Sequence, residues 1–140
     1  MAQLDYSFRD KDMAAEEKII RAGLNQYLDA ETGLERRYAG AFCHDNDKMI
    51  GGVTAHLIGG NLSVKLVWVD EAYRGQAIAT NLMRQIEEYA ADQGMAVSFV
   101  DTMSYQAPEF YVKIGYQEDA RVKNFYAGFD RIFYKKDLLK

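Results

Sequence analysis

Apolar residues recur at helical spacing in two stretches of the chain. The stronger pattern places six residues on one helical face: Ile78, Leu82, Met83, Ile86, Tyr89 and Ala90. Gly94 follows them at the position where a glycine commonly ends a helix. The weaker pattern predicts a helix from Asp12 to about Ala30, capped by Asp12, with Ile20, Leu24, Tyr27 and Leu28 on one side.

Short apolar or alternating runs predict strands before and after the second helix. The expected strands span residues 6–8, 37–43, 49–58, 62–69, 97–100, 116–121 and 130–136. Residues 62–69 alternate at first and are then continuously apolar, which predicts burial of both strand faces near Val69. Pro108 is expected in the first turn of a short helix that Gly115 ends, and residues 125–129 in a loop. This order of elements predicts one α/β domain over residues 1–140, built on a mixed sheet.

Composition and charge narrow the classes of function. The chain has 140 residues, a net charge of −4 and one cysteine. No apolar run is long enough to cross a bilayer and no signal peptide is visible, so we expect a cytoplasmic protein without a membrane partner. The acidic balance disfavours nucleic-acid binding and fits a cationic amine substrate better than an anionic one.

A strand, a tight turn and a helix meet at the centre of the chain. The apolar run Val67-Trp68-Val69 leads through residues 70–73 into Arg74-Gly75-Gln76-Ala77-Ile78-Ala79, where the stronger helical pattern begins. Such an arrangement aims free backbone N–H groups and the positive end of a helix at one point. The sequence therefore predicts a phosphate site here, although an ordinary strand-to-helix turn is the alternative.

Two motifs in this order resemble the GNAT-type N-acetyltransferases. Arg74-x-x-Ala77-x-Ala79 is similar to the family's acetyl-CoA motif, and residues 108–116 are similar to its second motif, a short helix bearing a tyrosine and followed by Gly-Tyr. The resemblance covers roughly residues 50 to 120 and departs from the family at Ala77, where a glycine is usual. It implies a central, mixed and mostly antiparallel sheet, splayed at the cofactor site, with helices on both faces.

The resemblance also implies acetyl-CoA as co-substrate, no metal, and transfer of the acetyl group to a primary amine by direct attack in a ternary complex. A homodimer is possible, because dimers are common among relatives. The helix expected near residues 12–30 would then be either a wall of the substrate site or a cover for the sheet.

Cofactor contacts are expected mainly from the backbone. The N–H groups of Gln76, Ala77, Ile78, Ala79 and Thr80 would line a pyrophosphate beside Arg74 and Gly75. The methyl group of Ala77 fits if its φ is negative; a positive φ there would weaken cofactor binding.

Further contacts follow from the resemblance. Main-chain groups of Val67 and Val69 would pair with the pantetheine arm as a neighbouring strand does, although both residues could equally be core. Trp68 points the opposite way and would face the acceptor or pack in the core. Ser104 would contact CoA or cap the next helix.

Tyr111 is the expected general acid, because the family places a tyrosine there to protonate the departing thiolate. Core packing is the alternative role for Tyr111, and Tyr116 and Tyr105 are alternative acids; Tyr105 is also expected beside the acceptor. Asp101, at the end of its predicted strand, is the candidate general base, although a structural aspartate that caps the following loop is the alternative.

Other kinds of site are disfavoured. His44, His56 and Cys43 show no metal-ligand spacing, and neither a P-loop nor a dinucleotide-binding fingerprint is present. A non-catalytic module that binds or senses CoA is the main competing hypothesis, motivated by Ala77 and by the lack of a glutamate on the strand before the turn. An interaction module that binds no CoA is a third.

Overall fold

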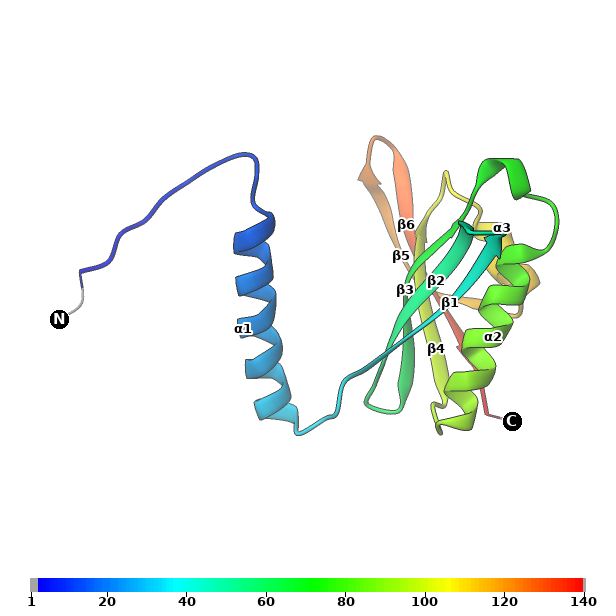
Figure 1. Cartoon of the computed structure of the whole chain (residues 1–140), viewed down its shortest axis with the longest axis horizontal. Coiled ribbons are helices and arrows are strands. Elements are labelled where there is room, and N and C mark those ends of the chain that lie inside the picture. Colours follow the sequence, from blue (N-terminus) through cyan, green and yellow to red (C-terminus); the bar gives the residue numbers. More distant parts are fainter. Residues whose placement is uncertain (1–2, 140) are drawn as a thin grey trace. The chain divides into compact units, whose positions relative to one another are not determined.

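The computed structural model describes residues 3–139, which form two compact units (Figure 1). The first unit ends at Glu35 and the second begins at Arg36. The first contains α1 (Ala14–Thr32). The second contains β1 (Arg37–Asp45), β2 (Lys48–Ile58), β3 (Asn61–Val69), a short 3₁₀ helix η1 (Glu71–Tyr73), α2 (Ile78–Asp92), β4 (Val97–Met103), α3 (Pro108–Lys113), β5 (Gln117–Tyr126) and β6 (Phe129–Asp137).

The first unit confirms the predicted helix but not its start. Asp12 does not cap α1, because its own φ is +59° and the N-cap position belongs to Met13, which makes no side-chain cap hydrogen bond. Gly33 ends the helix in the left-handed conformation, and its N–H bonds to the carbonyl of Asp29. None of the side chains of α1 is buried.

The strand predicted at residues 6–8 is wrong, since this segment has no regular structure. Two alternating apolar residues satisfy the pattern, but a strand needs a hydrogen-bonding neighbour and three residues offer little to pair.

Six strands of the second unit form one sheet in the order β1-β2-β3-β4-β6-β5. Every neighbouring pair is antiparallel except β3 and β4, which are parallel. The turn between β1 and β2 contains Asn46 at a φ of +54°, a conformation that asparagine tolerates better than most residues. The predicted mixed, mostly antiparallel sheet is therefore confirmed.

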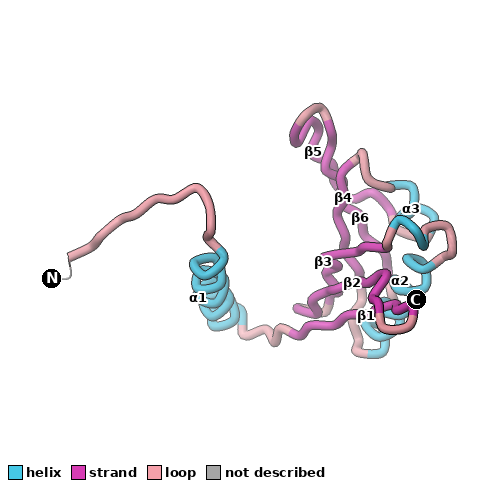
Figure 2. Tube along the Cα trace, turned by 45° about the horizontal axis from the view of Figure 1, so that its top comes forward, coloured by secondary structure: helices cyan, strands magenta, loops and turns pink. Residues whose placement is uncertain are grey.

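The helices α2 and α3 lie along one side of the strands (Figure 2). α2 contacts β1, β2 and β3 and buries four residues of its predicted face: Leu82, Met83, Ile86 and Ala90. They meet strand residues that are almost fully buried, among them Val53, Leu57 and Leu62. Tyr89 belongs to the same sequence pattern but lies at the edge of this contact and is exposed.

The sheet divides between β3 and β4. The two strands pair only over three residues each, from Asn61 to Ser63 and from Val97 to Phe99. The register between β2 and β3 shifts just beyond this point, between Thr54 and Ala55. The last residues of β3 consequently have β2 as a neighbour on one edge and, within residues 3–139, no strand on the other.

We call the opening between β3 and β4 beyond Ser63 and Phe99 the fork. The predicted burial of both faces of β3 near Val69 is wrong. Leu66 is 70% exposed and Trp68 is 49% exposed, although both belong to the continuously apolar run. The continuous apolar run is typical of a strand in the middle of a sheet, whereas this part of β3 lies along the fork and has no neighbouring strand on that edge. An apolar run beside an opening is typical of a ligand site.

Two other strands extend further than predicted. β4 continues to Met103, so Asp101 lies inside the strand, opposite Phe133, and not at its end. Tyr126 pairs with Phe129, which reduces the predicted loop of residues 125–129 to the turn at Ala127 and Gly128. In both cases pairing with β6 extends the strand, and local sequence patterns do not report such pairing.

Candidate active site

A turn with two left-handed residues connects β3 to α2. Asp70 fixes its beginning, because its carboxylate accepts a hydrogen bond of 2.9 Å from the N–H of Ala72 and so caps η1. Gly75 follows at a φ of +84° and Ala77 at +61°. A turn that contains such residues can point several N–H groups toward one position, where they bind anions.

Ala77 thus adopts the conformation for which the sequence predicted weaker cofactor binding. An L-residue with a Cβ atom pays about 1–2 kcal/mol for left-handed backbone angles. The chain nevertheless keeps this conformation immediately before α2, where Ala77 is the N-cap residue. The methyl group therefore changes the energy of the turn and not its shape.

The first amides of α2 have no partner within the helix. The first helical hydrogen bond runs from the N–H of Asn81 to the carbonyl of Ala77. The N–H groups of Ile78, Ala79 and Thr80 precede it and point out of the helix end. Together with the dipole of α2 they favour negative charge at this position.

A pocket of about 210 Å³ opens at this helix end. It is lined by nine residues: Val69, Tyr73, Arg74, Gly75, Ala77, Ile78, Ala79, Thr80 and Phe110. Seven of them are predicted cofactor residues, whereas the other three, Val67, Gln76 and Ser104, do not line the pocket. Arg74 is held in place by a hydrogen bond of 3.3 Å from its Nε to the carbonyl of Val69. The structure thus brings the end of β3 and the start of α2 to one concave site.

Tyr73 and Phe110 are pocket residues that the sequence analysis missed. Phe110 comes from α3, which is distant in sequence, and forms an edge-to-face contact with Tyr111 at 5.1 Å between ring centres. Its position directly before Tyr111 in the second motif was the available signal.

β3 offers an open edge beside this pocket. Val67 and Val69 lie opposite Val53 and Gly51 of β2, and beyond Ser63 their other edge faces the fork. Val67 packs partly against the core, while Trp68 points to the opposite face of the sheet and is half exposed. Trp68 is thus outside the core.

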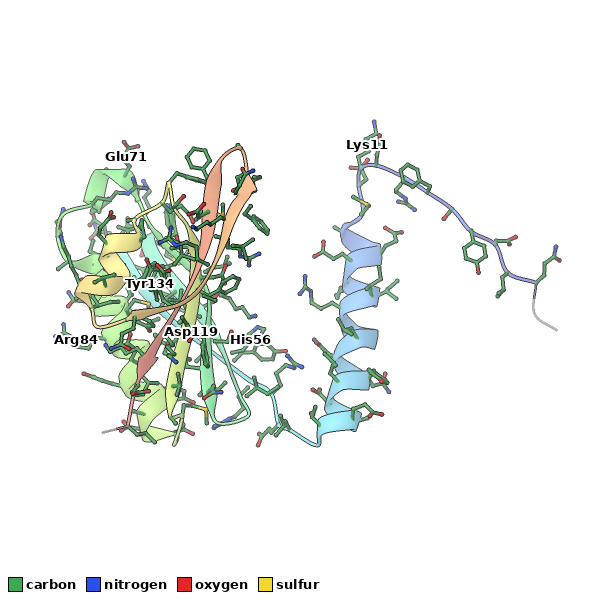
Figure 3. All side chains as sticks on the ribbon, turned by 180° about the vertical axis from the view of Figure 1, so that it is seen from behind. Lys11, His56, Glu71, Arg84, Asp119 and Tyr134 are labelled. Atoms are coloured by element: carbon green, nitrogen blue, oxygen red, sulfur yellow. The ribbon has the colours of Figure 1, made fainter. Side chains whose placement is uncertain are left out.

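Tyr111 is 8% exposed and lies between other aromatic rings. Its ring stacks on that of Tyr134 at 5.8 Å and meets the ring of Tyr116 edge-on at 5.9 Å; Tyr134 is labelled in Figure 3. Burial, and secondarily the negative charge of Asp101, raise the pKa of Tyr111 above its ordinary value. The phenol of Tyr111 therefore keeps its proton at neutral pH.

The hydroxyl groups of the three candidate tyrosines differ in their partners. The Tyr116 hydroxyl donates to Glu87 at 2.8 Å and is 2.7 Å from the Ser98 hydroxyl, and the Tyr105 hydroxyl is 2.5 Å from that of Tyr126. The Tyr111 hydroxyl has no hydrogen-bond partner among residues 3–139. Of the three, Tyr111 alone has a hydroxyl without a protein partner, although Tyr111 is not among the residues that line the pocket.

Asp101 is engaged by a neighbouring arginine. The Nε and Nη2 atoms of Arg131 lie 2.9 Å and 2.8 Å from the same carboxylate oxygen, Oδ2. Asp101 therefore does not cap the loop after its strand, which was the alternative role.

Ser104 and Tyr105 lie in the loop after β4. The Oγ of Ser104 accepts a hydrogen bond of 2.9 Å from the N–H of Asp130, and its own N–H bonds to the carbonyl of Asp130. Ser104 does not cap α3, because that helix begins after Ala107 without a side-chain cap. Tyr105 contacts Phe129 edge-on at 4.8 Å, beside the turn of the β5–β6 hairpin.

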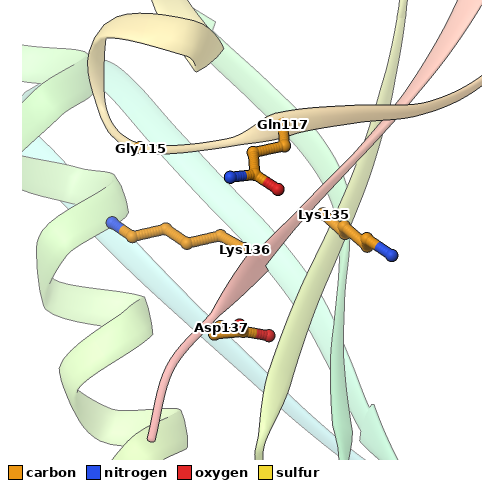
Figure 4. A pocket seen from close by; sticks show the side chains of 5 residues that line it. All are labelled: Gly115, Gln117, Lys135, Lys136 and Asp137. Carbon is orange, nitrogen blue, oxygen red and sulfur yellow. The ribbon is translucent and has the colours of Figure 1, made fainter. Parts of the chain in front are cut away.

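A partly buried ion pair joins α2 to β6, next to the end of α3. Glu87 of α2 is 8% exposed, and its Oε1 lies 2.6 Å from the Nζ of Lys136. The same Nζ donates to the carbonyl of Ile114 at 2.7 Å, and Figure 4 shows the Lys136 side chain extending past Gly115 toward the helix. The sequence analysis missed this ion pair, because Glu87 and Lys136 are 49 residues apart.

Among the described residues, no helix combines the length and hydrophobicity that a bilayer span requires. Residues 3–139 contain no group of three histidine, cysteine, aspartate or glutamate side chains placed to hold a metal ion.

Comparison with known proteins identifies the family of the chain. A family model described as "Acetyltransferase (GNAT) family" matches residues 5–116. A blasticidin-S acetyltransferase of Streptomyces morookaense is 31% identical over 102 residues, which cover 72% of this chain and 75% of that protein.

Solved structures show the same fold. The crystal structure of a protein described as an acetyltransferase from Agrobacterium tumefaciens has a TM-score of 0.82 and 29% identity, over 96% of this chain and 99% of that chain. A streptothricin acetyltransferase of Bacillus anthracis, solved with acetyl coenzyme A, has a TM-score of 0.65 and 17% identity, over 71% of this chain and 62% of that chain. The family match spans most of the chain, and the protein therefore belongs to the GNAT family of acetyltransferases.

Proposed function

We propose that the protein transfers the acetyl group of acetyl-CoA to a primary amine of a small molecule, by direct attack of the amine. The observation that carries this proposal is the pocket at the start of α2, where unpaired N–H groups, Arg74 and the open edge of β3 converge. A family of acetyltransferases needs such a place for the diphosphate and the thioester arm of its co-substrate.

The residues present fit acetyl-CoA. The N–H groups of residues 76–80 and the guanidinium of Arg74 would hold the diphosphate, and main-chain groups of Val67 and Val69 would pair with the pantetheine arm. The co-substrate supplies an acetyl group activated as a thioester. The streptothricin acetyltransferase with the same fold was solved with this molecule, which supports the assignment.

Tyr111 supplies a proton in this proposal. In the overall reaction one N–C bond forms and one C–S bond breaks; the amine loses a proton and the departing sulfur gains one. The free Tyr111 hydroxyl, whose pKa is raised by burial, is protonated over the physiological range and can donate at that step. Its ring contacts with Tyr134 and Tyr116 hold the phenol in one orientation.

Asp101 receives the proton of the amine, directly or through a water molecule. Its Oδ2 atom is bonded to Arg131, and no described residue bonds to its Oδ1 atom, which leaves one acceptor for the amine. A free alkylamine has a pKa near 10 and is mostly protonated at neutral pH, so a proton must leave its nitrogen before or during the attack, and the Oδ1 atom of Asp101 would accept that proton.

The acceptor is expected to be small, because a relative that shares 31% identity is named for its action on blasticidin S. Trp68 and Leu66, exposed beside the fork, would contact its carbon skeleton. Cytoplasmic location and a homodimer remain predictions.

Calorimetry with acetyl-CoA, followed by a thiol-release assay against a panel of amines, tests the proposal. We expect saturable binding and release of one CoA thiol for each amine acetylated. Absence of acetyl-CoA binding would contradict it. Tight binding without turnover of any amine would favour a CoA-sensing module instead.

A further inference from the structure

A second cavity, of about 380 Å³, lies at the fork between β3 and β4. β3, β4 and β6 contribute its lining: Ser63, Val64, Lys65, Phe99, Val100, Asp101, Arg131, Phe133 and Tyr134. It begins where the pairing between β3 and β4 ends, at Ser63 and Phe99. Its volume suits a small organic molecule.

The lining of the fork cavity contains more basic than acidic side chains. Asp101 and Arg131 form an ion pair that uses a single carboxylate oxygen and the Nε and Nη2 atoms of the guanidinium. Lys65 has no ion pair with any residue in 3–139. The lining thus carries two positive charges and one negative charge, although the whole chain has a net charge of −4.

Arg131 is held in a fixed position. Its guanidinium carbon lies 5.2 Å from the ring centre of Phe125 and 5.2 Å from that of Phe133. Aromatic contacts and the bond to Asp101 together leave the Nη1 atom without a described partner. A guanidinium restrained in this way is suited to bind a carboxylate, because little side-chain freedom is lost on binding.

The remaining walls are apolar and reach the predicted general acid. Phe99 and Phe133 are partly exposed to the cavity, and Tyr134 is buried behind them. Tyr134 in turn stacks on Tyr111. Tyr134 thus connects the wall of the fork cavity to the predicted general acid, while Asp101, the predicted general base, lines the cavity itself.

We propose that the fork cavity is the acceptor site and that it selects a primary amine that also carries a carboxylate. Lys65 and Arg131 bind the carboxylate, the Oδ1 atom of Asp101 accepts a hydrogen bond from the amine, and Phe99 and Phe133 contact the carbon skeleton. This inference rests on the proposed acetyl transfer and adds the substrate class. It replaces the purely cationic amine that the net charge of the chain suggested.

The test uses amines in matched pairs: amino acids and their carboxamides, such as phenylalanine and phenylalaninamide, or lysine and lysinamide. With saturating acetyl-CoA, we expect kcat/KM to be at least tenfold higher for the carboxylate member of at least one pair. Lys65→Met should reduce that ratio at least threefold, whereas Lys65→Arg should retain it. Lys123→Met, on β5 outside the cavity, is the matched control and should leave the ratio unchanged.

Equal kcat/KM within every pair that is turned over would overturn the inference and leave the acetyltransferase proposal intact. Failure to bind acetyl-CoA would instead refute the acetyltransferase proposal. If no amine of the panel is turned over, the same pairs are titrated into the CoA-bound protein and followed by NMR. Shifts of Lys65 and Phe99 that the carboxylate member alone produces would support the inference, and their absence for every pair would overturn it.

Discussion

The pocket at the start of α2 and the fork cavity are built by different parts of the chain. In the pocket, we expect backbone N–H groups of one short segment to bind the co-substrate, with the side chain of Arg74 beside them. In the fork cavity, side chains from β3, β4 and β6 supply the charges and the walls. A GNAT protein can therefore keep one co-substrate site while its acceptor site changes by substitution, because the two depend on different atoms.

The largest effect on stability is expected from the ion pair between Glu87 of α2 and Lys136 of β6. Lys136→Met leaves Glu87 buried without its partner, which should cost about 2 kcal/mol of unfolding free energy, because an uncompensated buried charge is strongly destabilising. Urea denaturation measures the loss. Lys135→Met is the matched control: its pair with Asp119 is exposed, so the expected loss is below about 1 kcal/mol. Equal losses of unfolding free energy for the two variants would contradict the stabilising role of the Glu87–Lys136 ion pair.

Tyr111→Phe should lower kcat at least tenfold and leave the Kd for acetyl-CoA within about twofold, because removal of a general acid typically costs about 10²–10⁴-fold and the ring contacts stay. Steady-state kinetics and calorimetry measure the two quantities. Tyr89→Phe, at an exposed position of α2, is the control. An unchanged kcat on an accepted amine would remove Tyr111 from the mechanism.

Ala77→Gly tests the claim that the pocket depends on backbone geometry. The substitution relieves about 1 kcal/mol of left-handed strain, which should appear as tighter acetyl-CoA binding, by up to about fivefold, or as higher stability. Ala127→Gly is a matched control, because Ala127 has a similar φ of +53° in the β5–β6 turn. It should raise stability alone. No change in either quantity for Ala77→Gly would contradict the account of this turn.

The smallest predicted effect is a loss of stability at alkaline pH, which is absent at neutral pH. Burial, and after it the charge of Glu87, raise the pKa of Tyr116 in the folded state, and burial raises that of Tyr111. Above about pH 10 the unfolded chain loses these protons first, so the unfolding free energy should fall as pH rises further. Tyr116→Phe should make this alkaline decline shallower, as urea titrations between pH 9 and about pH 11 would show. An unchanged slope would contradict the assignment.

The contrast between the two regions also explains what could be predicted from the sequence. The turn at residues 74–80 is a local strand–turn–helix signal, and six of its seven predicted contacts line one pocket. Even there, Ala77 suited a negative φ by residue type, whereas the approach of β3 to α2 imposes a positive one.

The fork cavity could not be predicted in the same way. The apolar run that contains Val67 and Trp68 predicted a strand buried on both faces. The separation of β4 from β3 beyond Ser63 is not visible in the sequence of that run. Arg131 is 30 residues from Asp101, and Lys136 is 49 from Glu87, so these pairs depend on the strand order β4-β6-β5. Local propensity does not contain that order.

An NMR titration of the ¹⁵N-labelled protein with acetyl-CoA tests the central claim most directly. The account predicts that the amide signals of residues 76–80 move most, together with those of Val67 and Val69 on the open edge of β3. Saturation with the largest shifts elsewhere, or no shift at these amides, would contradict it.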